Sequence, residues 1–153
     1  MSSSDKKDVL IVDDDDSIRT LLRRVLERLE LTCDTAVDGE DALAKIEQQQ
    51  YSVVLSDLMM PRVDGAELAR RLAVMERESA ERTVVLIMTA YPQSERLTSL
   101  ADTVQAVVRK PFDVDELSEV VRACVHAQRG PSSPRSRNGV SAFRIAPRIT
   151  SMS

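Results

Sequence analysis

Five short apolar runs recur along the chain, and a stretch with helical spacing follows each of them. The runs are Val9–Val12, Leu31–Ala36, Tyr51–Leu55, Val84–Met88 and Val104–Val108. They are short and mostly rich in valine and isoleucine, as expected of β-strands. Those that begin at Val9, Val84 and Val104 are continuous rather than alternating, which is typical of a parallel sheet covered on both faces.

Apolar residues at helical spacing lie between these runs. The clearest set runs from Ile18 to Leu29, with Asp16 and Ser17 as candidate caps at its start. Further helices are predicted after Asp38-Gly39, after Gly65, over Gln93–Asp102 and over Val114–Arg129, and the fourth of the five has the fewest apolar residues. The order of elements is strand–helix repeated five times, which predicts an α/β fold with a doubly wound five-stranded parallel sheet.

Composition divides the chain into three parts. Its 153 residues are 42% hydrophobic, enough for the core of one domain. From Gly130 onward Gly, Pro, Ser and Arg dominate and helical spacing ends, which is typical of disorder. We therefore predict a flexible N-terminus over 1–7, one domain over 8–129 and a Ser/Pro/Arg-rich disordered tail over 130–153.

The charge is unevenly distributed between these parts. All 25 acidic residues but only 17 of the 21 basic residues precede Gly130, so residues 1–129 carry a net charge of −8. An acidic surface disfavours nucleic-acid binding by the folded domain. The widely separated Cys33 and Cys124 favour a reducing compartment. No apolar run approaches the ~18 residues of a membrane span or a signal peptide, so we expect a cytoplasmic protein without a membrane partner.

Polar residues follow four of the five predicted strands. Asp13 and Asp14 follow the first strand, Asp57 follows the third, Thr89 ends the fourth and Lys110 follows the fifth. In an open α/β sheet, ligands bind outside the carboxyl ends of the strands. Each residue alone could be a turn, cap or solvated surface residue, but their joint placement at one edge favours a functional site.

The chemistry of these residue types is consistent with one reaction. Three converging carboxylates repel one another unless a cation neutralises them, and oxygen ligands at an accessible edge favour Mg²⁺. A carboxylate beside Mg²⁺, with an ammonium and a hydroxyl nearby, is suited to accept a phosphoryl group. The product would be an aspartyl phosphate.

Four segments give the chain a resemblance to the receiver domain of two-component response regulators. They are Val9–Asp15, Leu55–Pro61 with Asp64-Gly65, Leu86–Ala90 and Lys110–Phe112. Successive separations of 43 residues from Asp14 to Asp57, 32 to Thr89 and 21 to Lys110 make the combination specific. The resemblance implies a flavodoxin-like (βα)5 fold with strand order 2-1-3-4-5 and places the chain among stand-alone, chemotaxis-regulator-like receivers.

The resemblance also implies a metal site for Mg²⁺. By this analogy Asp14 and Asp57 would bind the ion directly, and Asp13 would act largely through water. The backbone carbonyl of Met59 would complete the protein ligands.

The same resemblance implies roles in phosphoryl transfer. Asp57 would be the phosphoacceptor, taking the group from a sensor histidine kinase or a histidine phosphotransfer protein. Lys110, joined to Pro111 by a cis peptide bond, would pair with the phosphoryl group. Thr89 and the backbone N–H of Ala90 would bind a phosphoryl oxygen, and this movement would switch binding of a downstream protein partner.

Two departures from the family pattern bear on this interpretation. Val107 stands where many members carry Tyr or Phe, so the aromatic readout is absent. Met59 and Tyr91 border the site, and we expect them to restrict the attacking water and prolong the life of the phosphorylated state. Arg19 and Arg23 lie on the first helix, where the family usually meets its kinase. His126, the only histidine, is expected to be an ordinary helix residue.

Two alternatives belong to other functional classes. A phosphatase of the haloacid-dehalogenase type would use Asp13 as its nucleophile, but the final position of that motif is Ser17 rather than Thr or Val. A receiver-like binding module that is never phosphorylated is the other alternative. The leading interpretation remains a single-domain response regulator, which catalyses its own phosphoryl transfer and hydrolysis and has no separate substrate.

Overall fold

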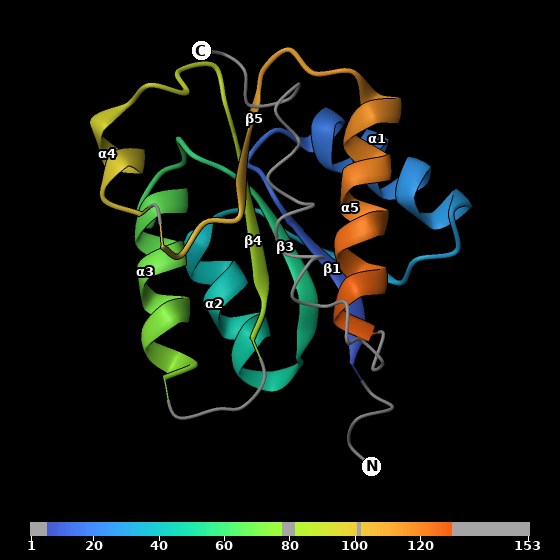
Figure 1. Cartoon of the computed structure of the whole chain (residues 1–153), viewed down its shortest axis with the longest axis horizontal. Helices are drawn as coiled ribbons and strands as arrows, with labels where there is room; N and C mark the ends of the chain where they lie inside the picture. The colour runs from blue at the N-terminus through green and yellow to red at the C-terminus, as the bar shows by residue number, and fades with distance from the viewer. Residues whose placement is uncertain (1–5, 78–81, 101, 130–153) are drawn as a thin grey trace.

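The computed structural model describes residues 6–77, 82–100 and 102–129. Strands and helices alternate along the chain, as predicted (Figure 1). The elements are β1 (Lys7–Val12), α1 (Asp16–Arg28), β2 (Cys33–Ala36), α2 (Gly39–Gln48), β3 (Tyr51–Asp57), α3 (Gly65–Met75), β4 (Val84–Thr89), α4 (Glu95–Thr98), β5 (Ala106–Arg109) and α5 (Val114–Arg129). Residues 1–5 and the tail 130–153 lie outside the described residues.

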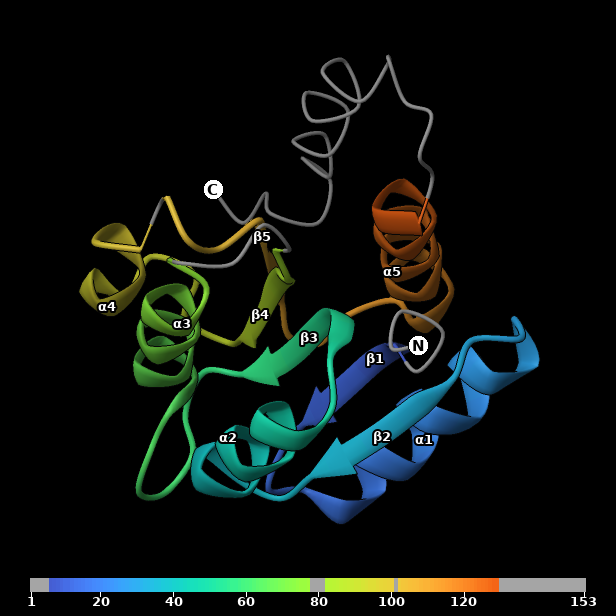
Figure 2. The same cartoon turned by 90° about the horizontal axis from the view of Figure 1, so that it is seen from below.

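The five strands form one parallel sheet with the order β2-β1-β3-β4-β5, which confirms the predicted topology. Figure 2 shows α1 and α5 on one face of this sheet and α2, α3 and α4 on the other. No helix in the described ranges has both the length and the apolar character needed to cross a membrane.

Alternate residues of the central strands contribute to two separate cores. Leu10 and Val54 pack with the buried residues of α2 and α3, whereas Ile11 and Leu55 pack with those of α1 and α5. Because successive side chains of a strand point to opposite faces, a sheet covered on both faces favours apolar residues at successive positions. This preference explains the continuous apolar runs.

Side-chain caps start the helices close to the carboxyl ends of the strands. Asp15 caps α1 by accepting hydrogen bonds from the N–H groups of Ser17 and Ile18, so the cap is one residue earlier than predicted. Asp38 caps α2 and Asp64 caps α3 in the same manner. An aspartate at this position satisfies N–H groups that have no partner within the helix.

The fourth helix is much shorter than the predicted span of Gln93–Asp102. Ser94 caps it, but after Thr98 the chain tightens into turns, in which the Leu100 N–H donates to the Leu97 carbonyl. Leu97 and Leu100 are both buried and anchor the segment to the core shared with α2 and α3. Two buried leucines hold the segment to the sheet without a long amphipathic helix.

Candidate functional site

The carboxyl ends of β1, β3, β4 and β5 carry the predicted site residues. Asp13 directly follows β1, Asp57 is the last residue of β3, Thr89 is the last residue of β4, and Lys110 directly follows β5. Asp57 is in register with Met88, one residue before Thr89, so these strand ends lie side by side.

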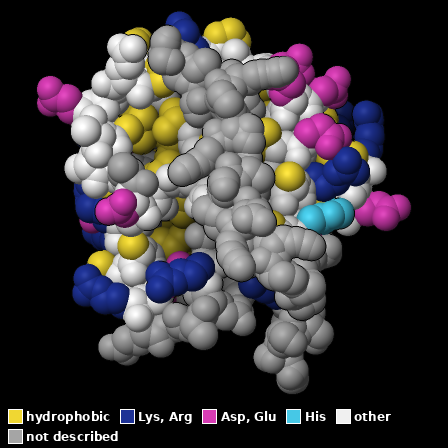
Figure 3. Space-filling model, in the orientation of Figure 1, with side chains coloured by type: hydrophobic (Ala, Val, Ile, Leu, Met, Phe, Trp, Pro, Cys, Tyr) yellow, Lys and Arg dark blue, Asp and Glu magenta, His cyan; other side chains and the backbone are white. Residues whose placement is uncertain are grey.

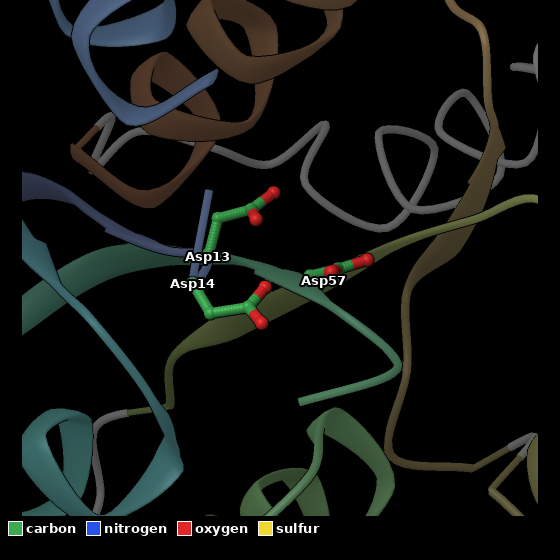
Figure 4. A group of neighbouring side chains, drawn as sticks. All are labelled: Asp13, Asp14 and Asp57. Carbon is green, nitrogen blue, oxygen red and sulfur yellow. The ribbon is translucent and has the colours of Figure 1, made fainter. Parts of the chain in front are cut away.

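Three carboxylates lie together at this edge. Figure 4 shows the side chains of Asp13 and Asp14, from the end of β1, lying beside that of Asp57. One carboxylate oxygen from each lies within 4.8 Å of the others. Asp13 is fully buried and Asp57 is 8% exposed, whereas Asp14 is open to solvent.

Lys110 connects β5 to the acidic cluster. Its Nζ lies 3.1 Å from Oδ1 of Asp57 and 3.6 Å from Oδ2 of Asp13. The Lys110–Pro111 peptide bond is cis. The ammonium therefore forms a hydrogen-bonded ion pair with Asp57 and a longer electrostatic contact with Asp13.

Burial and mutual repulsion shift the protonation of the cluster. Burial is the main cause that raises the pKa of Asp57, and the nearby charge of Asp13 raises it further. Burial likewise raises the pKa of Asp13, although Lys110 and the Asp15 N–H partly oppose this. Burial alone would lower the pKa of Lys110, but its pairing with Asp57 and Asp13 outweighs burial and raises it. Burial and mutual repulsion thus make the ionised forms of Asp13 and Asp57 unfavourable in the folded protein.

The donor set fits Mg²⁺. Oδ2 of Asp13 is buried and accepts no hydrogen bond from any residue in the described ranges. A buried acceptor without a donor is costly, and a cation at the cluster would relieve that cost. The three converging groups are carboxylates, the ligand type that Mg²⁺ prefers, and Asp14 faces solvent, where the ion can keep its waters.

The remaining predicted residues lie at the end of β4 and on the loops that follow β3 and β4. The Thr89 hydroxyl is buried and accepts a hydrogen bond from the Tyr91 N–H at 2.9 Å, so it is engaged by its own loop. Ala90 is exposed, and the side chains of Met59 and Tyr91 are 56% and 69% exposed. Met59 and Tyr91 therefore lie on the loops after β3 and β4 with largely exposed side chains.

Other residues considered in the sequence lie away from the cluster. His126 is exposed on α5, and its side chain is the cyan histidine on the surface in Figure 3. Cys33 and Cys124 are free and buried, and burial raises the pKa of each thiol to about 12. Val107 is partly buried against the core shared with α2 and α3.

Sequence reasoning missed two contacts near the site. Arg19 donates a hydrogen bond to the Asp13 carbonyl at 2.7 Å, although the sequence suggested only a kinase-facing surface role. Arg96 of α4 forms an ion pair with Asp64, the cap of α3. A cation at the end of the first turn of a helix opposes the helix dipole, and that unfavourable position was the available signal for Arg19.

Gly65 brings α3 against the end of β3, where Asp57 lies. A Cβ at this position would lie 2.4 Å from the backbone oxygen of Asp57, which is closer than atoms can approach. The Gly65 N–H also donates to the Leu58 carbonyl. The Asp64-Gly65 pair thus both caps α3 and permits its close approach to Asp57.

Comparison with known proteins identifies the family. The model of the response regulator receiver domain matches residues 9–122. The chain belongs to the response regulator receiver family. The match lies within the interval 8–129 predicted for the domain, and the predicted resemblance is confirmed. The haloacid-dehalogenase alternative is set aside, because the matched segment includes the strand ends on which it depended.

Relatives of this receiver include regulators from several bacteria. It is 35% identical to the response regulator MprA of Mycobacterium sp. (strain KMS) over 82% of this chain and 55% of that protein. It is 32% identical to the transcriptional regulatory protein ResD of Bacillus subtilis (strain 168) over 80% of this chain and 50% of that protein. The chain thus spans about half the length of these curated relatives.

Solved receiver structures share the fold over most of their length. A CheY-like receiver domain from Methanospirillum hungatei superposes with a TM-score of 0.72 at 27% identity, covering 81% of this chain and 97% of that one. TrrA from Thermotoga maritima, solved in complex with Mg²⁺ and BeF, has a TM-score of 0.65 at 30% identity, covering 77% and 98%. Receiver domains bind Mg²⁺ at an acidic cluster and are phosphorylated by histidine kinases or phosphotransfer proteins.

Proposed function

We propose that this receiver accepts a phosphoryl group on Asp57 in an Mg²⁺-dependent reaction and thereby switches the binding of a protein partner. The donor is the phosphohistidine of a sensor histidine kinase or of a histidine phosphotransfer protein. The observation that carries the proposal is the cluster itself: three carboxylates within 4.8 Å, with Lys110 Nζ 3.1 Å from Asp57. The buried, free cysteines are in keeping with action in the cytoplasm.

The transfer forms one bond and breaks another. An oxygen of the Asp57 carboxylate attacks phosphorus, the P–N bond breaks, and its electron pair returns to the imidazole nitrogen of the donor. Bound Mg²⁺ would supply charge neutralisation and orientation of the phosphoryl oxygens. Lys110 is placed beside Asp57 to stabilise the added negative charge from the other side.

The proposed ligand set assigns distinct roles to the acidic residues. Asp14 and Asp57 would bind Mg²⁺ directly, with the Met59 carbonyl, and the buried Asp13 would act largely through water. The Mg²⁺ and BeF complex of TrrA, a receiver 30% identical to this chain, supports a site of this type.

The switch would use the loop after β4. Thr89 and the Ala90 N–H would bind a phosphoryl oxygen, so the Thr89 hydroxyl would exchange its present bond with the Tyr91 N–H for one to the phosphoryl group. Movement of this loop would alter the surface formed by α4, β5 and α5, shifting an existing equilibrium. Because Val107 stands where many receivers carry an aromatic residue, no aromatic side chain at that position would carry the signal.

Intact mass spectrometry after incubation with acetyl phosphate tests the proposal. We expect one added phosphoryl group in the presence of Mg²⁺ and none in EDTA or in Asp57→Asn. Asp102→Asn, which changes an exposed carboxylate before β5, is the matched control and should be modified like the wild type. Failure to form either an adduct or a beryllofluoride complex, in a folded protein that binds Mg²⁺, would instead indicate a receiver that works without phosphorylation.

A further inference from the structure

The acidic run that follows β1 places four consecutive carboxylates in the short loop 13–15 and at the first residue of α1. Asp15 is occupied in capping α1, and its N–H donates to Oδ1 of Asp13 at 2.9 Å. Asp16 points to solvent, with 87% of its side chain exposed, and pairs with Arg19. Only Asp13 and Asp14 contribute to the cluster with Asp57. Four neighbouring negative charges repel one another. Further contacts are needed to keep the carboxylates of Asp13 and Asp14 beside Asp57 and those of Asp15 and Asp16 away from it.

Arg19 makes the contacts that could do so. Its Nη1 donates to the Asp13 backbone carbonyl at 2.7 Å, and its Nη2 donates to Oδ1 of Asp16 at 2.6 Å. The side chain is only 14% exposed, although Arg19 lies on a surface helix. One planar guanidinium therefore joins the residue at the start of the acidic run to the residue at its end.

Two free-energy terms oppose this placement of Arg19, and an ordinary surface ion pair would not require it. Ordering an arginine side chain loses rotamer entropy, and a cation near the start of a helix opposes the helix dipole. Arg23, one turn further along α1, shows the ordinary alternative, since it pairs with Glu27 while about half of each side chain stays exposed. Arg19 instead turns back toward the strand end.

We propose that Arg19 is a positioning residue for the Mg²⁺ site. By fixing the Asp13 carbonyl and Asp16, it sets the course of the loop so that the Asp13 and Asp14 carboxylates face Asp57 before the ion binds. This inference rests on the proposed Mg²⁺-dependent function of the cluster. It does not require Arg19 to contact the ion or the phosphoryl group.

Charge and positioning make opposite predictions for a variant without the guanidinium. A positive charge near the site repels Mg²⁺, so its removal alone would tighten binding of the ion. Loss of a group that orients metal ligands weakens binding, by about tenfold in comparable sites. The direction of the change in affinity therefore decides between the two effects.

Isothermal titration of the full chain with Mg²⁺ provides the test. We expect the Kd of Arg19→Gln to rise about tenfold. That of Arg19→Lys, which keeps the charge but lacks the planar fork of the guanidinium, should rise by a smaller factor. Arg23→Gln is the matched control and should bind like the wild type. A Kd for Arg19→Gln that equals or falls below the wild-type value would overturn the proposal.

The kinetics of phosphorylation by acetyl phosphate distinguish a positioning role of Arg19 from a general loss of activity. Because acetyl phosphate is a small-molecule donor, contacts of α1 with a kinase do not affect these rates. In Arg19→Gln the Mg²⁺ concentration for half-maximal rate should rise while the maximal rate is retained. A lower maximal rate with an unchanged Mg²⁺ requirement would count against the role of Arg19. If Arg19→Gln is unfolded by circular dichroism, Arg19→Lys decides the matter, and wild-type Mg²⁺ affinity in that variant would overturn the inference. A wild type that binds no Mg²⁺ would overturn the proposed function as well, whereas normal wild-type binding confines a failure to Arg19.

Discussion

Neutralising Asp57, the proposed phosphoacceptor, should stabilise the protein in the absence of metal. In Asp57→Asn the shape of the side chain is nearly kept, but one of the three converging charges is removed. We expect the free energy of unfolding in EDTA at neutral pH to rise by about 2 kcal/mol, because the raised pKa of Asp57 means that its ionised form is unfavourable in the folded state.

The magnitude follows from the geometry of the cluster. At an effective dielectric constant of about 20, charges within 4.8 Å repel by at least about 3.5 kcal/mol, which applies to Asp13 and Asp57. Lys110 at 3.1 Å attracts Asp57 by about 5 kcal/mol on the same scale. Asp14 is exposed, so water screens its charge, and at a dielectric constant of about 80 it adds a repulsion of only about 1 kcal/mol. Burying the Asp57 carboxylate costs several kcal/mol more. The sum opposes ionisation by a few kcal/mol.

The pH dependence has a definite sign. A carboxyl whose pKa is raised on folding binds its proton more tightly in the folded state, so stability falls as pH rises from the unfolded pKa of about 4 through the folded pKa. The advantage of Asp57→Asn should therefore be small near pH 4 and reach its full size at neutral pH. Asp102→Asn, at an exposed position, should stay within about 0.5 kcal/mol of the wild type throughout.

Urea unfolding with and without Mg²⁺ provides the assay. If Mg²⁺ binds the folded state as proposed, it should stabilise the wild type in proportion to the logarithm of ion concentration. The variant lacks the charge of one proposed ligand and should gain less. The two proteins should thus approach one another in stability as Mg²⁺ is added. A variant less stable than the wild type in EDTA, or an equal gain from Mg²⁺ in both, would refute the reasoning.

Two further predictions concern the sheet edge and the mouth of the site. Tyr51→Phe should lower the free energy of unfolding by about 1.5–3 kcal/mol, because the buried Tyr51 hydroxyl donates to Asp34 at 2.6 Å. Burial acts to raise the pKa of Asp34, but the hydrogen bonds from Tyr51 and Lys7 outweigh it and lower that pKa. The loss of stability in Tyr51→Phe should therefore shrink as pH falls below about 4. Tyr91→Phe, at an exposed position, is the control and should have little effect at any pH. In Met59→Asn, loss of the apolar group should shorten the lifetime of the phosphorylated state measured by intact mass, and an unchanged or longer lifetime would contradict the role given to Met59.

The sequence predicted the convergence of the site because the strand ends were readable. Once the apolar runs were assigned to one parallel sheet, Asp57, Thr89 and Lys110 had to emerge at the same edge. The cap of α1 was predicted one residue late because several consecutive aspartates can serve, and only the extended backbone of Asp15 selects among them. The contact of Arg19 with the Asp13 carbonyl depends on the course of that loop, which no spacing rule encodes.

The sheet holds the repelling carboxylates of the site together, so the same residues that would serve function reduce the stability of the fold. Val12 and Ser56 pair in register at the ends of β1 and β3, and both are fully buried, so the backbone that follows them has little freedom. This rigidity holds Asp13 and Asp57 together despite their repulsion, with the two apolar cores supplying the stability that the carboxylates reduce. Substitutions that neutralise one of the clustered carboxylates should therefore reduce the repulsion and stabilise the fold, whereas substitutions in the core should destabilise the fold and loosen the site together.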